Sequence, residues 1–101
     1  MKIKKKIAII NYGMGNINSI KTSLNYLAVK NDIIDKPNQI YNYTHIILPG
    51  VGSFKKAIRN LKYSGLFNSI KNVSKNKKQK ILGICLGMQL LFESSTEEGL
   101  T

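Results

Sequence analysis

The only cysteine of the chain, Cys85, stands in a pattern that suits a nucleophile. Residues 83–87 read G-I-C-L-G, with an apolar run before them and the apolar segment 88–92 after them. This is the cysteine counterpart of the G-x-S-x-G nucleophile elbow, in which flanking glycines leave room for a tight strand-to-helix turn. The dipole of the following helix favours the reactive thiolate, and the backbone N–H of Leu86 can help to stabilise an oxyanion.

The ordinary structural explanation of Cys85 is a small buried residue at a strand end, with glycines that only permit close packing. For an isolated cysteine that explanation would be preferred. Glycines on both sides of Cys85, together with the strand–turn–helix context, favour the nucleophile.

A second glycine-rich loop could complete the site. Residues 48–54 read L-P-G-V-G-S-F after an apolar run, and the two glycines free the backbone to turn its N–H groups toward a neighbour. If the strands before the two loops are adjacent, this loop lies beside Cys85 and supplies the other half of an oxyanion hole. The alternative is an ordinary Pro-Gly turn before a helix.

His45 is the only histidine, and its position argues against a role as the base for Cys85. It opens the apolar run 45–48, whereas the glycine-rich loop lies at the far end of that run. Four strand residues at about 3.3 Å each place it about 13 Å from the active edge. A base must reach hydrogen-bond distance of its nucleophile, so His45 is expected to be structural or exposed.

These loops require a scaffold in which strands and helices alternate. Apolar runs predict strands over 7–10, 33–34, 45–48 and 80–85, with a loop over 11–16 and a turn at 37–38. Helical spacing predicts helices over 17–28, 54–61 (capped by Ser53 and ended at 64–65), 66–73 and from 88, before a polar loop over 93–101. The alternation indicates an α/β fold whose parallel sheet carries helices on both faces, with sites outside the carboxyl ends of the strands.

The composition limits the class of protein. A hydrophobic fraction of 43% is ordinary for one globular domain of 101 residues. A single cysteine excludes an internal disulfide, no apolar run approaches the ~18 residues of a membrane span, and the run after the lysine-rich start is too short for a secretion signal. A cytoplasmic protein with no membrane partner is expected.

The net charge of +11 also fits a nucleic-acid-binding protein. However, fifteen of the sixteen basic residues are lysine, and Arg59 is the only arginine. Phosphate and base recognition favour the planar guanidinium of arginine over the lysine ammonium. A solvated lysine-rich surface is therefore favoured, with weak non-specific polyanion binding at low salt left open and no specific nucleic acid expected.

Three motifs together resemble a known family. Residues 11–20 read N-Y-G-M-G-N-I-N-S-I, residues 49–54 read P-G-V-G-S-F, and residues 83–95 read G-I-C-L-G-M-Q-L-L-F-E-S-S. The cysteine motif resembles class I glutamine amidotransferases, and the first two motifs narrow the resemblance to the glutaminase subunits of imidazole glycerol phosphate synthase. The resemblance runs from about Ile7 to Thr101 and implies a flavodoxin-like parallel sheet.

The resemblance implies a role for each matching residue. Cys85 would form a glutamyl thioester, and the backbones of Val51 and Leu86 would provide the oxyanion hole. The family releases ammonia from glutamine for a partner cyclase in histidine biosynthesis and needs no cofactor or metal.

The remaining site residues follow from the same motifs. Gly52, Gln89 and Glu97 would contact the substrate glutamine. Asn16 lies in the loop that would face the cyclase subunit in a heterodimer.

The family's subunits are roughly twice this length, so residues 1–101 would be the N-terminal half of a glutamine amidotransferase type 1 domain, ending after the nucleophile helix. The triad histidine and glutamate would lie outside it, and the isolated chain is expected to be inactive. Three alternatives stay open: the glutaminase of another class I amidotransferase, a non-catalytic binding module of the same fold and, ranked last, a nucleic-acid-binding protein.

Overall fold

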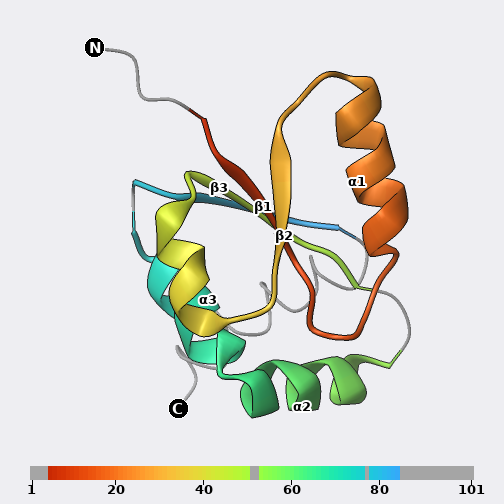
Figure 1. Ribbon diagram of the computed structural model, residues 1–101. Helices are drawn as coiled ribbons and strands as arrows, with labels where there is room; N and C mark the ends of the chain where they lie inside the picture. Colours follow the sequence, from red (N-terminus) through yellow and green to blue (C-terminus); the bar gives the residue numbers. More distant parts are fainter. Residues whose placement is uncertain (1–4, 51–52, 77, 85–101) are drawn as a thin grey trace.

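A computed structural model describes residues 5–50, 53–76 and 78–84. Its centre is a four-stranded parallel sheet in the order β2-β1-β3-β4, flanked by helices on both faces (Figure 1). This is the predicted flavodoxin-like arrangement. The strands are β1 (Ile7–Ile10), β2 (Asn31–Ile34), β3 (His45–Leu48) and β4 (Lys80–Gly83).

The helices divide between the two faces of the sheet. One face is covered by α1, which contacts β1 and β2, and α3 contacts β4 and the 3-10 helix η1 on the other. In Figure 1, α2 lies across the lower end of the molecule, below the turn that follows β1. The helices are α1 (Ile17–Tyr26), η1 (Pro37–Asn42), α2 (Phe54–Ser64) and α3 (Leu66–Ser74).

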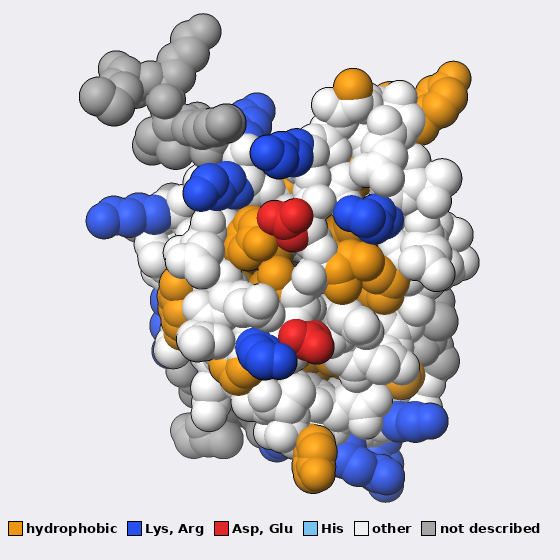
Figure 2. Space-filling model, in the orientation of Figure 1, with side chains coloured by type: hydrophobic (Ala, Val, Ile, Leu, Met, Phe, Trp, Pro, Cys, Tyr) orange, Lys and Arg blue, Asp and Glu red, His pale blue; other side chains and the backbone are white. Residues whose placement is uncertain are grey.

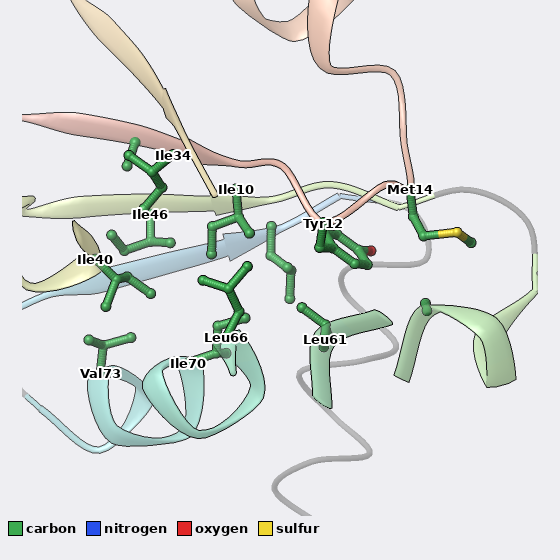
Figure 3. Close-up of a cluster of buried hydrophobic side chains, with 13 residues drawn as sticks. Ile10, Tyr12, Met14, Ile34, Ile40, Ile46, Leu61, Leu66, Ile70 and Val73 are labelled. Carbon is green, nitrogen blue, oxygen red and sulfur yellow. The ribbon is translucent and has the colours of Figure 1, made fainter. Parts of the chain in front are cut away.

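The main core lies between the sheet and the pair α2 and α3 (Figure 3). Alternate strand residues point to opposite faces, so Ile46 and Leu48 enter this core, whereas Ile47 faces α1. The α1 face is less completely covered. Ile47 and Leu82 line an apolar groove of about 330 Å³ beside α1, and no α1 residue is fully buried.

Most of the predicted elements are confirmed. The strands are parallel, β3 and β4 are adjacent, and Ser53 caps α2 by accepting a hydrogen bond of 3.3 Å from the N–H of Lys56. The predicted break at 64–65 is confirmed by Gly65, which ends α2 at a φ of +82°. Left-handed backbone of this kind is accessible to glycine without steric cost.

Three predictions about the first half were wrong. Helix α1 ends at Tyr26 rather than at Ala28, which has a φ of +60° and leaves the helical path. Strand β2 begins at Asn31 because hydrogen bonds satisfy the buried amide of that residue. The expected turn at 37–38 is a 3-10 helix over Pro37–Asn42, whose start is fixed by the Gln39 side chain accepting from the backbone N–H of Lys36.

Two further predictions, the helix from 88 and the polar loop over 93–101, lie outside the described residues. Within the described part of the chain, no helix has the length and apolar character required to cross a membrane.

Candidate functional site

The carboxyl ends of three strands meet at one edge of the sheet. Ile9 is paired with Ile47, and Leu48 with Gly83, so the loops after β1, β3 and β4 leave the sheet side by side. The pairing of β3 with β4 continues to the last described residue, because the N–H of Ile84 donates to the carbonyl of Leu48 over 3.0 Å. This is the edge at which parallel α/β sheets bind ligands.

The loop after β1 is anchored on the loop after β3. The Tyr12 hydroxyl donates a buried hydrogen bond of 2.5 Å to the carbonyl oxygen of Pro49. Burial raises the pKa of Tyr12 from 10.0 to about 12, so the phenol keeps its proton at neutral pH. A buried carbonyl is costly without a donor, so Tyr12 holds the β3 loop at a defined height above the sheet.

Gly15 brings the same two loops into direct backbone contact. Its φ is +98°, and a Cβ added to it would lie 3.0 Å from both the Gly50 nitrogen and the Pro49 Cβ. Gly13 also has a positive φ, +85°, but its nearest neighbour would be the side-chain nitrogen of Asn60, at 3.2 Å. Gly15 is therefore needed for close approach as well as for its backbone conformation.

Asn16 joins this loop to α1. Its Oδ1 accepts a hydrogen bond of 3.3 Å from the N–H of Ser19, which makes Asn16 the N-cap of α1. Its side chain is exposed at the carboxyl edge, where a partner can reach it. A capping asparagine leaves the rest of its amide free for contacts outside the helix.

His45 lies at the opposite edge of the sheet, as predicted. It is paired with Ile7 and Lys80 at the amino ends of their strands, and its Nδ1 lies 2.8 Å from the Thr44 hydroxyl. Within residues 5–50, 53–76 and 78–84, no three His, Cys, Asp or Glu side chains are grouped so as to hold a metal ion.

Six of the proposed site residues lie outside the described residues, and only Asn16 lies within them. The described residues next to these positions in the sequence are Gly50, Ser53 and Ile84. The six are Val51, Gly52, Cys85, Leu86, Gln89 and Glu97.

Sequence reasoning missed Tyr12 as a residue of this edge. The sequence pattern places it in the loop 11–16 and indicates no role of its own for it. The available signal was a large aromatic residue between Asn11 and Gly13, since an aromatic side chain in a glycine-rich loop needs a place to be buried.

Comparisons with known proteins find relatives that align with most of the chain. It is 47% identical over 95 residues to "Imidazole glycerol phosphate synthase subunit HisH" of Geobacillus sp. (strain WCH70), covering 94% of this chain and 44% of that protein. The same subunit of Prochlorococcus marinus subsp. pastoris (strain CCMP1986 / NIES-2087 / MED4) is 51% identical over 92 residues, covering 91% of this chain and 44% of that protein. The chain thus spans less than half the length of these curated relatives.

A solved structure described as "Crystal structure of glutamine amidotransferase" has the same fold. It superposes with a TM-score of 0.68 at 16% identity, covering 79% of this chain and 42% of that one. The family model "Glutamine amidotransferase class-I" matches residues 8–98, which include both glycine-rich loops of the carboxyl edge and Cys85. The chain therefore belongs to the class I glutamine amidotransferase family.

Proposed function

We propose that the chain is part of the glutaminase subunit of imidazole glycerol phosphate synthase, which hydrolyses glutamine and delivers ammonia to a cyclase subunit in histidine biosynthesis. The observation that carries this proposal is identity of about half of all residues, over nine-tenths of the chain, to proteins bearing that subunit's name. Lyase activity of the complex, a heterodimer with the cyclase and a cytoplasmic location belong to the same proposal.

In the proposed reaction, Cys85 acts as the nucleophile. Its thiolate attacks the side-chain amide carbon of glutamine, ammonia leaves, and water hydrolyses the resulting thioester to glutamate and free thiol. The backbone N–H groups of Val51 and Leu86 stabilise the oxyanion formed in both steps. Gly52, Gln89 and Glu97 hold the substrate, and Asn16 faces the cyclase.

The geometry of the described residues supports these roles. Val51 follows Gly50, which is held by the loop after β1 through Gly15 and through the hydrogen bond of Tyr12 to Pro49. Cys85 follows Ile84, whose backbone is bonded to Leu48 on the neighbouring strand. Gly50 and Ile84, the described residues that precede Val51 and Cys85, thus lie just beyond the ends of adjacent strands at one edge of the sheet.

We further propose that residues 1–101 form the amino-terminal half of the amidotransferase domain and depend on the rest of that domain for a catalytic base. The position of His45 at the opposite edge supports this division. The 101-residue chain alone is therefore expected to release no ammonia at an enzymatic rate, because an oxyanion hole without a base retains only a small part of the acceleration of a triad.

The test uses the full-length protein with its cyclase subunit. A glutamine-like electrophile, such as a diazo-ketone analogue, should label Cys85, and Cys85→Ser should lose both labelling and ammonia release. His45→Asn is the matched control. It removes the only described imidazole, and it should keep both labelling and ammonia release because His45 lies at the opposite edge of the sheet. Glutamine hydrolysis that survives in Cys85→Ser, or is lost in His45→Asn, would contradict the assignment.

A further inference from the structure

The charged side chains of the surface are not gathered at one place, whereas one buried polar contact lies directly at the carboxyl edge. In Figure 2, Lys and Arg side chains are spread over the upper, middle and lower parts of the face shown. The side chain of Tyr12, by contrast, is only 5% exposed, and its hydroxyl donates to the carbonyl oxygen of Pro49 over 2.5 Å. A buried and satisfied hydrogen bond of this kind holds both partners in one orientation.

Pro49 has a single soft backbone torsion. Its ring fixes φ, and the peptide bond that joins it to Gly50 is planar and trans. The remaining torsion, ψ, decides to which side the Pro49 carbonyl points. The helical and polyproline regions of ψ, near about −42° and +145°, turn the following peptide to nearly opposite sides. The Tyr12 hydroxyl reaches the carbonyl in only one of these orientations, so the hydrogen bond fixes ψ of Pro49.

Other contacts limit where this peptide lies without fixing its direction. Within the part of the chain that the structure describes, the Tyr12 hydroxyl is the only hydrogen-bond donor to the Pro49 carbonyl. Gly15 packs against the following residue, since a Cβ added to Gly15 would lie 3.0 Å from the nitrogen and 3.3 Å from the Cα of Gly50. A van der Waals contact of this kind excludes positions but does not orient a carbonyl. The orientation of the Pro49–Gly50 peptide therefore depends on Tyr12.

We propose that Tyr12 is a positioning residue for glutamine hydrolysis, whose hydroxyl orients the peptide after Pro49 and, through it, the backbone N–H of Val51. The inference rests on the proposed function, in which this N–H is one of the two oxyanion donors. Such a donor stabilises the transition state only where the negative charge develops, and a displacement of about 1 Å costs about 100-fold in rate. Tyr12 therefore acts on turnover and needs no contact with the substrate.

The hydroxyl acts as a hydrogen-bond donor and not as an acid or a base. Burial raises the pKa of Tyr12 from 10.0 to about 12, so the phenol keeps its proton at every pH below 10. Removal of the hydroxyl should therefore lower the rate by the same factor at every such pH. Removal of a catalytic acid or base would instead change the shape of the pH profile.

The experiment compares Tyr12→Phe with two controls, each in the full-length protein with its cyclase subunit. Tyr43→Phe is the chemical match, because it also removes a hydroxyl that donates a hydrogen bond, to Asp32 over 2.9 Å, but near the amino end of β3. Val73→Ala is the stability match. It removes two methyl groups from a fully buried side chain of α3, which Figure 3 shows at the far end of the core from Tyr12.

Two measurements separate positioning from general loosening. Ammonia release gives kcat and KM for glutamine, and mass spectrometry gives the rate at which iodoacetamide alkylates Cys85. Alkylation displaces iodide from a saturated carbon and forms no oxyanion, so it does not depend on the Val51 donor. For Tyr12→Phe we expect kcat to fall at least about 10-fold at every pH below 10, with KM and the alkylation rate within about threefold of the unaltered protein. Both controls should keep kcat within about twofold.

Three results would overturn the inference and leave the proposed function standing. A kcat of Tyr12→Phe close to that of the unaltered protein would mean that the peptide is oriented without the hydroxyl. An equal loss of kcat in either control would attribute the effect to stability. A parallel loss of kcat and of Cys85 alkylation would mean that the whole site is disturbed. If the unaltered protein with its cyclase releases no ammonia from glutamine, the proposed function itself fails, and the inference fails with it.

Discussion

Replacing Gly15 by alanine should damage the protein more than replacing Gly13, although both glycines lie in one loop. Each has a positive φ, so each alanine pays a similar conformational penalty of about 1–2 kcal/mol. The difference lies in what the new Cβ meets. At Gly13 it meets the end of the Asn60 side chain, which can move, whereas at Gly15 it meets the Gly50 nitrogen and the Pro49 ring at 3.0 Å.

The magnitude follows from adding the two effects. Forcing a methyl group into a contact that cannot yield costs about 1–3 kcal/mol beyond the conformational term. Gly15→Ala should therefore destabilise the protein by roughly 2–5 kcal/mol, against about 1–2 kcal/mol for Gly13→Ala. In addition, the movement is forced on Gly50, which precedes the proposed oxyanion donor Val51, and loss of such a donor would cost about 100- to 1,000-fold in kcat.

Two measurements on the full-length proteins separate these effects. Urea unfolding gives the free energy of unfolding of both variants, and ammonia release in the presence of the cyclase gives kcat under conditions where both are folded. We expect Gly15→Ala to be the less stable variant and to lose kcat, and Gly13→Ala to keep kcat within a few fold. Equal destabilisation by the two substitutions would show that the contact with Gly50 is not rigid, and the reasoning would fail.

Three further changes test other contacts. Tyr12→Phe should lower the free energy of unfolding by about 1–3 kcal/mol, because it leaves the Pro49 carbonyl unpaired. The pKa of Tyr12 is raised in the folded protein from 10.0 to about 12, so the stability advantage of Tyr12 over Phe should be constant below pH 10 and shrink as the pH rises toward 12. Urea unfolding at a series of pH values measures this dependence. Asn31→Leu should lower the free energy of unfolding by about 1–3 kcal/mol and speed hydrogen exchange in α1. The control Asp32→Asn, at an exposed position, should change neither quantity. Ser53→Ala should cost about 1 kcal/mol in urea unfolding, with Ser53→Thr nearly neutral.

Much of the fold could be predicted because β1 and β3 are short isoleucine-rich runs that end at Asn11 and at Pro49. A run such as 46–48 is apolar at every position and has to be buried on both faces, which indicates a parallel sheet. The proposed position of the site rests on the rule that parallel α/β sheets bind ligands at the carboxyl ends of their strands. The distant edge position of His45 followed from strand geometry alone.

The contacts that fix the site could not be predicted in the same way. The hydrogen bond from Tyr12 to Pro49 joins residues 37 positions apart, and no local sequence pattern predicts a hydrogen bond over such a separation. Asn31 reads as a helix-ending residue, and only the satisfied hydrogen bonds of its side chain make it a buried strand residue. Tertiary contacts determine the structure at both positions, and the intrinsic secondary-structure propensities of single residues do not predict such contacts.

The two faces of the sheet are held by different physical means. The side covered by α2 and α3 depends on apolar burial, with Ile40, Leu66 and Val73 completely inaccessible. On the other side α1 buries no residue fully, and Asn31 holds it through bonds from Lys21 and to Asn25. Hydrogen bonds of this kind contribute about 1 kcal/mol each, less than a buried leucine or isoleucine. Local opening of α1 should therefore precede loss of the main core, because few apolar contacts have to be broken to release it.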